Sequence, residues 1–305
     1  MMNNFIFENK TKVYFGKGGV KEYLGGLLAN FGETVMLAYG GGSIKRNGVY
    51  DEIMGILNAA GKRIVEFSGI MSNPTYAKVQ EGAKLARENH VDLILAVGGG
   101  SVSDCCKVIS GAFDTLSHAM ETYFGKPDEN NLSDDINEAV MRSVIRNIRI
   151  LLTDPENYDA RSELAWASAM AENGVLKIGK VTDFQAHQIE HQLGAYTNCN
   201  HGAGLAVIHP VLYRHIYKSG TARFTRWAQN VWGIAPKGSD EETAAAGIDA
   251  LAAFIKEIGL PTSFADLGIP ADTDFRAIAD STNVTAGCCK KLTHDEIYEI
   301  LQECL

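Results

Sequence analysis

Several signals of secreted, membrane-bound and disulfide-bonded proteins are missing from this 305-residue sequence. The N-terminus has neither the charged nor the apolar region of a signal peptide, and no apolar stretch reaches the roughly 18 residues that span a bilayer. The six cysteines include the adjacent pairs Cys105-Cys106 and Cys288-Cys289, which suit neither a disulfide framework nor a C-x-x-C zinc site. We therefore expect a cytoplasmic protein with reduced thiols and no membrane partner.

The sequence also has no basic run, and its formal net charge is -9 at pH 7. Because nucleic-acid binding depends on clustered Lys and Arg, this charge argues against a nucleic-acid partner. Hydrophobic residues make up 46% of the chain and charged residues 21%, which is typical of a globular protein. The length is sufficient for two domains.

The generic dinucleotide motif G-x-G-x-x-G is absent as well, because Lys45 and Ser103 stand where its third glycine would be. Over the first hundred residues, short apolar runs nevertheless alternate with helical patterns, which predicts a parallel sheet with crossover helices. The expected strands are residues 12–15, 34–39, 63–67 and 92–97.

Two of these strands run into glycine-rich turns. The turns are Gly40, Gly41, Gly42 and Ser43 after the second strand, and Gly98, Gly99, Gly100 and Ser101 after the fourth. A glycine-rich turn between a strand and a helix presents backbone N–H groups to an anion, which makes both turns candidate phosphate sites. The alternative is a pair of tight turns that need glycine only for a positive φ.

From residue 111 onward, strand patterns nearly vanish and helical periodicity takes over. The clearest helical segments are residues 134–152, 160–173, 243–258 and 293–304. Thr293 and Glu296 have the spacing of a capping box at the start of the last segment. We therefore predict an α/β domain over residues 1–110 and an all-helical domain over residues 111–305.

One carboxylate and three imidazoles in this second half form a candidate metal site. Asp114 and His118 are four residues apart in a helix-compatible run, so both side chains leave one helical face. His187 and His191 have the same spacing, and His201 follows shortly after them. Such a set suits Fe(II), Zn(II), Co(II) or Ni(II), and the ligand types do not choose among these ions. Either cluster alone is also explained by a local hydrogen bond.

Together these motifs resemble the iron-containing alcohol dehydrogenase family, and within it the butanol dehydrogenase branch. The matching motifs stand in family order at residues 39–51, 69–74, 96–104, 114–121, 187–191 and 201–202. The resemblance implies the dehydroquinate synthase-like architecture, in which an α/β nucleotide-binding domain with a parallel sheet precedes an all-α metal-binding domain. It implies Fe(II), or Zn(II), bound at four ligand positions, which here are Asp114, His118, His187 and His201.

The resemblance also implies a catalytic position and a nucleotide site. It places His191 near the substrate and the nicotinamide, where the residue relays a proton or orients the substrate, or else only hydrogen-bonds a metal ligand. The cofactor-binding positions are Gly40, Gly41, Gly42, Ser43, Asn73, Gly98, Gly99, Gly100, Ser101 and Asp104. Members confined to NAD tend to carry an acidic residue where Gly40 stands, so NADP(H) is favoured here, with NAD(H) as the alternative.

The match breaks between Ser110 and Gly111, where the family has on the order of 80 further residues, room for two βαβ units. In the family, that segment supplies further strands and a loop around the nicotinamide. Its absence predicts an unpaired sheet edge, exposed apolar surface and a single helix running through Gly111. The gap has three alternative origins. It is a natural deletion, a splicing or annotation artefact, or a stretch of residues omitted from the printed sequence.

The expected function is that of a metal-dependent, NAD(P)H-linked alcohol dehydrogenase or aldehyde reductase that acts on small primary alcohols such as butanol. Dimers are common in the family, so a homodimer is compatible with this expectation. The alternative is a noncatalytic metal-binding or oligomerisation remnant of the same family, because the missing segment removes contacts to the nicotinamide. A glycerol dehydrogenase or a dehydroquinate synthase-like lyase is a more distant third option.

Overall fold

The structure, a computed structural model, describes residues 6–8, 11–70, 76–98, 105–284 and 289–305. The chain divides into two compact units. The sheet unit comprises Lys10–Lys107, and the helical unit comprises Val108–Leu305 together with Met1–Asn9. Within the described ranges, no helix is both long enough and apolar enough to cross a membrane.

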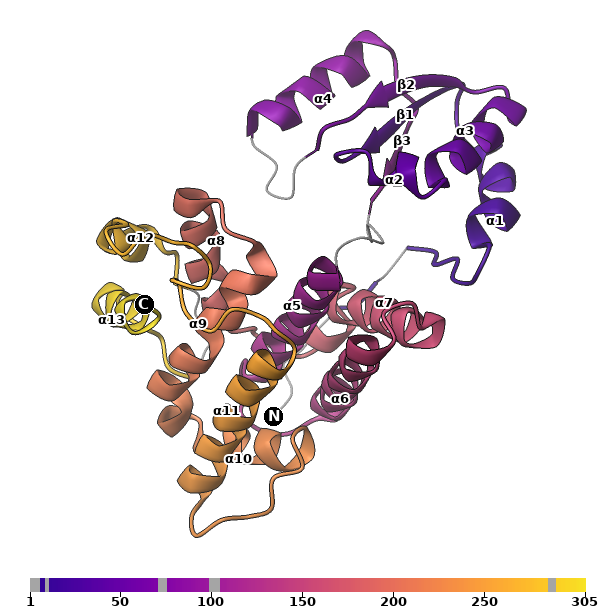
Figure 1. The fold of residues 1–305 in the computed structure, drawn as a ribbon. Helices are drawn as coiled ribbons and strands as arrows, with labels where there is room; N and C mark the ends of the chain where they lie inside the picture. The colour runs from indigo at the N-terminus through magenta and orange to yellow at the C-terminus, as the bar shows by residue number, and fades with distance from the viewer. Residues whose placement is uncertain (1–5, 9–10, 71–75, 99–104, 285–288) are drawn as a thin grey trace. The chain divides into compact units, whose positions relative to one another are not determined.

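The sheet unit contains a parallel sheet of three strands, in the order β2-β1-β3. The strands are β1 (Thr34–Tyr39), β2 (Arg63–Phe67) and β3 (Leu93–Val97). The helices between and before them are α1 (Gly19–Leu28), α2 (Ser43–Arg46), α3 (Val49–Ala59) and α4 (Tyr76–Glu88). The predicted parallel sheet with crossover helices is therefore confirmed (Figure 1).

The central strand β1 is buried at all six positions because helices cover both faces of the sheet. Val35, Leu37 and Tyr39 face a core that includes apolar side chains of α1, α2 and α3. Met36 and Ala38 face the opposite core, where Leu85 of α4 packs. A strand buried on both faces reads as a continuous apolar run, which is why the sequence indicated β1 so clearly.

Strand β3 is covered less completely than β1. Leu93, Leu95 and Val97 are half-buried, whereas Ile94 and Ala96, which point to the opposite face, are exposed. Ile94 is 60% exposed. Among the described residues β3 pairs only with β1, so its other edge offers unpaired backbone groups. The expected apolar exposure at an open sheet edge is thus present.

The predicted strand at residues 12–15 is wrong. These residues have no regular secondary structure and pair with no described strand. Val13 is 57% exposed, and Tyr14 and Phe15 are also exposed. A strand gains stability from pairing with a neighbouring strand and from a covered face, whereas residues 12–15 are exposed and lie outside the described sheet.

The helical unit is built from α-helices around one continuous apolar core. The helices are α5 (Cys105–Tyr123), α6 (Leu132–Thr153), α7 (Tyr158–Glu172), α8 (Gln185–Thr197), α9 (His201–Ile216), α10 (Thr221–Asn230), α11 (Asp240–Glu257), α12 (Phe275–Ser281) and α13 (His294–Glu303). All four predicted helical segments are confirmed, as is the capping box of Thr293 and Glu296.

Helix α5 runs through Gly111 without interruption, as the direct junction of Ser110 and Gly111 predicted. Its fully buried side chains, Phe113, Leu116 and Met120, lie in the core of the helical unit. Because Asp114 and His118 are on the same helix, burial of α5 fixes where both side chains point.

Candidate functional site

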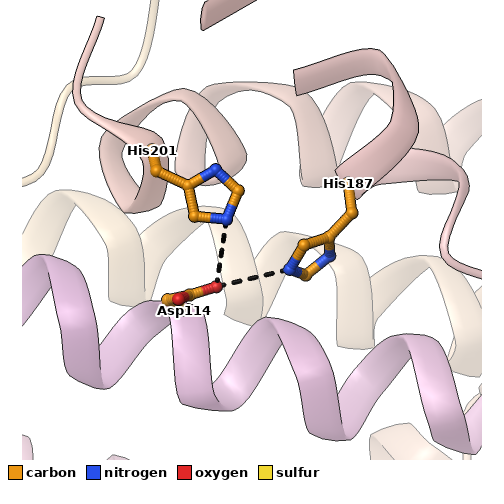
Figure 2. Close-up of side chains that lie close together, drawn as sticks. All are labelled: Asp114, His187 and His201. Carbon is orange, nitrogen blue, oxygen red and sulfur yellow. Dashed lines mark ion pairs between the residues drawn. The ribbon is translucent and has the colours of Figure 1, made fainter. Parts of the chain in front are cut away.

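The predicted metal ligands come together where α5, α8 and α9 meet. Asp114 Oδ1 lies 3.3 Å from Nε2 of His187 and 3.5 Å from Nε2 of His201. Figure 2 shows both rings pointing toward the Asp114 carboxylate from other helices. Nε2 of His118, one turn further along α5, is 3.7 Å from the same oxygen. The ligand atoms that all lie within 4.8 Å of one another are those of Asp114, His187 and His201, and His118 lies beside this group.

Local structure at the start of α9 brings His201 to α5. Asn200 caps α9 by accepting a hydrogen bond from the Ala203 backbone N–H, and its side chain also accepts one from the Ser110 hydroxyl at 2.6 Å. A Cβ on Gly202 would lie 2.2 Å from the Ser110 carbonyl oxygen. Only glycine therefore allows α9 to approach α5 closely enough for His201 to reach Asp114.

Two buried carboxylates fix the orientation of two of the rings. Glu121 contacts Nδ1 of His187 and also accepts a hydrogen bond from the Ala186 backbone N–H at 2.6 Å. Glu190 contacts Nδ1 of His201. In the neutral form of each ring, a proton on Nδ1 is donated to the carboxylate and the lone pair of Nε2 faces Asp114. Carboxylates behind histidine ligands are a common feature of metal sites.

The atoms at the centre of the site are acceptors that lack a donor. Asp114 Oδ1 and His187 Nε2 are buried and have no hydrogen-bond partner. Ligand atoms of Asp114, His187 and His201 all lie within 4.8 Å of one another. Buried acceptors without donors are costly, and a shared cation removes that cost. The residues present therefore fit a divalent metal ion.

The electrostatics of the site also favour a bound positive charge. Burial disfavours a charged His187, yet Glu121 and Asp114 together raise its pKa to about 9. Burial likewise opposes charge on His201, but Asp114 and Glu190 raise its pKa to about 10. Burial disfavours a charged Asp114, but the close imidazoles of His187 and His201 outweigh it and hold its pKa below the usual range. The cluster therefore attracts positive charge, either as protons or as a metal ion.

His118 differs from the other two imidazoles. Burial and the charge of His187 lower its pKa to about 4. Its Nδ1 is buried without a partner, so no carboxylate fixes this ring from behind. Instead, Nε2 lies 3.1 Å from Oε1 of Glu172, the last residue of α7.

His191, the predicted catalytic residue, lies beside the cluster. Its ring is nearly parallel to the ring of His201, and the centroids of these two rings are 5.4 Å apart. The centroid of the His191 ring lies 5.9 Å from that of the His187 ring. The residue is exposed, in contrast to buried His187. Burial of its ring atoms, followed by the charges of His187 and His201, lowers its pKa. His191 is thus placed to contact both the cluster and solvent.

Three carboxylates at the site, Glu121, Glu172 and Glu190, were not assigned a role from the sequence. Glu121 follows His118 by three residues and Glu190 follows His187 by three, so helical spacing could have indicated both. Glu172 has no such signal, because it belongs to a different helix and approaches His118 only through the packing of α7 near α5.

The two glycine-rich turns lie at one edge of the sheet unit. Tyr39 pairs with Val97 in parallel β1 and β3, so Gly40 and Gly98 follow their strands at the same end of the sheet. Gly42 has φ 96° and precedes α2. Predicted nucleotide residues Asn73, Gly99, Gly100, Ser101 and Asp104 lie outside the described residues.

A polar network flanks the first of these turns. The Tyr39 and Tyr50 hydroxyls donate hydrogen bonds to Glu66, at 2.6 and 2.7 Å, and Lys45 lies 3.7 Å from the same carboxylate. Hydrogen bonds from the two tyrosines lower the pKa of Glu66. The negative charge of Glu66 is therefore engaged by side chains of its own unit.

Comparisons with known proteins give one consistent result. Residues 108–305 match the model "Fe-containing alcohol dehydrogenase family, C-terminal", and residues 10–139 match "Iron-containing alcohol dehydrogenase". The probable NADH-dependent butanol dehydrogenase 1 of Bacillus subtilis is 31% identical over 389 residues, covering 100% of both chains. The NADPH-dependent aldehyde reductase YqhD of Escherichia coli is 27% identical, covering 88% of this chain and 90% of that protein.

A solved structure, the NADH-dependent butanol dehydrogenase A of Thermotoga maritima, superposes with a TM-score of 0.90 at 28% identity, covering 99% of each chain. The alignment with the Bacillus subtilis relative spans 389 positions and this chain has 305 residues, so at least 84 positions have no counterpart here. That difference matches in size the segment expected between Ser110 and Gly111. The chain belongs to the iron-containing alcohol dehydrogenase family.

Proposed function

We propose that this protein is a metal-dependent, NAD(P)H-linked alcohol dehydrogenase or aldehyde reductase that acts on small primary alcohols and aldehydes. The observation that carries the proposal is the convergence of three imidazole nitrogens on one buried carboxylate oxygen, Asp114 Oδ1, without a hydrogen-bond donor between them. The names of the relatives, butanol dehydrogenases and an aldehyde reductase, support the same class of substrate.

In this proposal, Asp114, His118, His187 and His201 hold a divalent ion, Fe(II) or Zn(II). Such an ion polarises a carbonyl oxygen as a Lewis acid, and a nicotinamide supplies or accepts the hydride. Glu121 and Glu190 keep Nε2 of His187 and His201 directed inward. Loss of either carboxylate would let its ring rotate and change tautomer.

His191 is proposed to move the proton that balances hydride transfer. Reduction of an aldehyde requires a proton at the developing alcohol oxygen, and oxidation requires its removal. His191 is exposed and stacks beside His201, so it can pass a proton between a substrate oxygen and solvent. Orientation of the substrate by a hydrogen bond from the same ring is the alternative role.

We propose NADP(H) as the favoured nucleotide, bound by Gly40, Gly41, Gly42, Ser43 and Gly98 together with the family positions outside the described residues. An acidic side chain at Gly40 would repel a 2′-phosphate, and none is present. A Cβ at Gly40 would come within 3.1 Å of the Ile70 carbonyl oxygen, so this turn is fitted to glycine. Exposed Lys45 and Arg46 follow Ser43 on α2 and add positive charge nearby.

The test is reconstitution of the purified chain with Fe(II) or Zn(II) under anaerobic conditions, followed by oxidation of NADPH in the presence of butanal. We expect turnover that requires the metal, is lost in His187→Ala, and is slower with NADH. Metal binding without any NADPH or NADH oxidation would contradict the proposal.

A second candidate function, metal binding without catalysis, is favoured by the three-stranded sheet and its open β3 edge. Hydride transfer depends on a nicotinamide held near its target carbon, and such positioning can account for about 7 to 11 kcal/mol of barrier lowering. Titration calorimetry with NADPH distinguishes the candidates. Stable metal occupancy with no nucleotide binding would support the noncatalytic function.

A further inference from the structure

Phe184, directly before α8, has a backbone conformation that phenylalanine rarely adopts. Its φ is 54° and its ψ is 22°, in the left-handed region, where a bulky side chain costs free energy. The other described non-glycine residues with positive φ are His90 and Asn198, and Asn198 ends α8 at a position where asparagine is common. A bulky residue held in this region beside a functional site indicates that its side chain has a role there.

Capping of α8 does not explain this conformation. Phe184 occupies the N-cap position but makes no side-chain capping hydrogen bond. The backbone N–H groups of Ala186 and His187 instead donate to the carboxylate of Glu121 from α5, at 2.6 and 3.3 Å. Because a neighbouring helix supplies the acceptor, residue 184 is free of the role that usually favours Ser, Thr, Asp or Asn at this position.

The ring of Phe184 lies against two imidazoles of the metal cluster. Its centroid is 5.0 Å from that of His187, in a tilted arrangement, and 5.3 Å from that of His118, edge to face. Phe184 is half-buried, so part of its surface faces solvent. Nζ of Lys177 lies 4.9 Å from the centre of the same ring. The left-handed backbone thus presents a partly exposed apolar ring, bordered by a cation, next to the proposed metal position.

Two exposed side chains also border the cluster, and both are polar. Glu172 forms an ion pair with His118, and the ring of His191 stacks beside that of His201. A ligand that enters from solvent therefore meets a carboxylate, an imidazole and the Phe184 ring. An alkyl chain gains free energy by leaving water for apolar surface. Of these three groups, Phe184 alone offers such surface.

We propose that Phe184 receives the alkyl chain of the substrate and thereby determines which alcohols and aldehydes bind. This inference rests on the proposed function for the metal ion and the class of reaction, and it adds a specificity-determining residue. An alkyl chain attached to the reacting carbon lies against the Phe184 ring, whose surroundings include the ammonium group of Lys177. Because the exposed apolar area is only part of one ring, a short chain fills it and a longer chain extends into water.

The test uses Co(II) bound to the full-length chain and two alkanethiols, ethanethiol and 1-butanethiol, under anaerobic conditions. A thiolate is a metal ligand, and its binding to Co(II) produces an ultraviolet absorption band from which the affinity is measured. The two thiols differ only by two CH2 groups. The ratio of their affinities therefore measures the contact of the alkyl chain, cancels any change in the metal site itself, and requires no turnover.

The compared proteins are wild type, Phe184→Asn, Phe184→Gly and the control Tyr196→Asn. Asn and Gly both tolerate the left-handed conformation, so neither substitution opposes the backbone of residue 184. Tyr196 is a 53% exposed aromatic residue of the same helix, and its replacement tests whether loss of any aromatic side chain from α8 has the same effect. Far-ultraviolet circular dichroism verifies folding.

We expect wild type and Tyr196→Asn to bind butanethiol about five- to tenfold more tightly than ethanethiol, because a fully buried CH2 group raises affinity by about fourfold. In Phe184→Asn and Phe184→Gly, the ratio should fall below about twofold, because the apolar surface is gone. A ratio near one in wild type, or the wild-type ratio in both Phe184 variants, overturns the role of Phe184.

The same experiment separates this inference from the function on which it rests. If wild type binds Co(II) and both thiols, but the Phe184 variants keep the wild-type ratio, the metal site stands and only the role of Phe184 fails. If wild type binds no Co(II), or binds it without binding either thiol, the proposed function and the role of Phe184 are overturned together.

Discussion

The helical unit and the sheet unit differ in how completely their elements are covered. In the helical unit, Phe113, Leu116 and Met120 of α5 are fully buried between other helices. In the sheet unit, β1 is fully buried, but its neighbour β3 leaves Ile94 60% exposed. In the part of the chain that the structure describes, β3 forms one edge of a sheet of three strands.

This difference falls between the unit that holds the proposed metal ligands and the unit that holds the proposed nucleotide-binding turns. Every proposed metal ligand and both supporting carboxylates, Glu121 and Glu190, belong to the helical unit, whose core is continuous. The glycine-rich turns belong to the sheet unit, and the chain lacks counterparts for at least 84 positions of the Bacillus subtilis relative. In the proposed function, metal binding depends on the helical unit and nucleotide binding on the sheet unit.

The largest expected effect is loss of the metal site by Asp114→Asn. Because Asp114 Oδ1 is the oxygen on which all three imidazoles converge, its replacement by an amide should weaken metal binding by more than the roughly 100-fold that loss of an outer partner can cost. Metal content after dialysis measures this loss. NADPH affinity should stay at the wild-type value, and a parallel loss of nucleotide binding would show that the two units are not separable.

A second expected effect concerns acid stability and His209, which is buried in the helical unit. Burial lowers its pKa to about 4, and its Nε2 lies 2.6 Å from the Ser117 hydroxyl. Since the unfolded pKa is near 6.5, the neutral residue contributes stability that is complete above pH 6.5 and is lost as pH falls toward 4. Relative to His209→Gln, wild type should lose roughly 3 kcal/mol of unfolding free energy between pH 7 and pH 4.

Urea unfolding followed by tryptophan fluorescence measures this difference in unfolding free energy for the helical unit. Trp166, Trp227 and Trp232 are the three tryptophans of the chain, and all belong to the helical unit. Equal pH dependence in wild type and His209→Gln would mean that the pKa of His209 is the same in the folded and unfolded states, which would contradict the prediction.

An intermediate effect is expected from Glu121→Gln and Glu190→Gln. Each variant removes the charge behind a histidine ring and should weaken metal binding by about 10- to 100-fold without abolishing it. Chelator competition measures the change. The control is Glu257→Gln, which removes an exposed carboxylate paired with Arg149 in the same unit and should have no effect. Wild-type affinity in both test variants would contradict a supporting role for Glu121 and Glu190.

The smallest expected effect lies at the sheet edge. Ile94→Lys should delay aggregation on heating, because a charged side chain on an exposed edge strand opposes pairing with another chain. Light scattering during a temperature ramp measures the onset, and metal affinity should not change. Ile150→Lys, at a 37% exposed position of α6, is the matched control in the helical unit. A larger delay from Ile150→Lys would show that the weak point lies outside the sheet.

Local patterns account for most of what could be predicted. The continuous apolar run of β1 and the capping box of Thr293 and Glu296 are specified by adjacent residues, so the sequence alone identifies them. The segment at residues 12–15 has the same apolar character, yet it forms no strand because strand formation depends on a partner elsewhere in the chain. The spacing of Asp114 and His118 placed them on one helical face for the same local reason.

By itself, the sequence determined which residues share a helix face, where helices begin, and that one acid and three imidazoles are available for a metal. Only the tertiary structure decided that His201 reaches Asp114, through the contact of Gly202 with Ser110, and that Glu172 meets His118 from another helix. Spacing along one helix follows from its 3.6-residue period, whereas contact between helices depends on how their side chains pack.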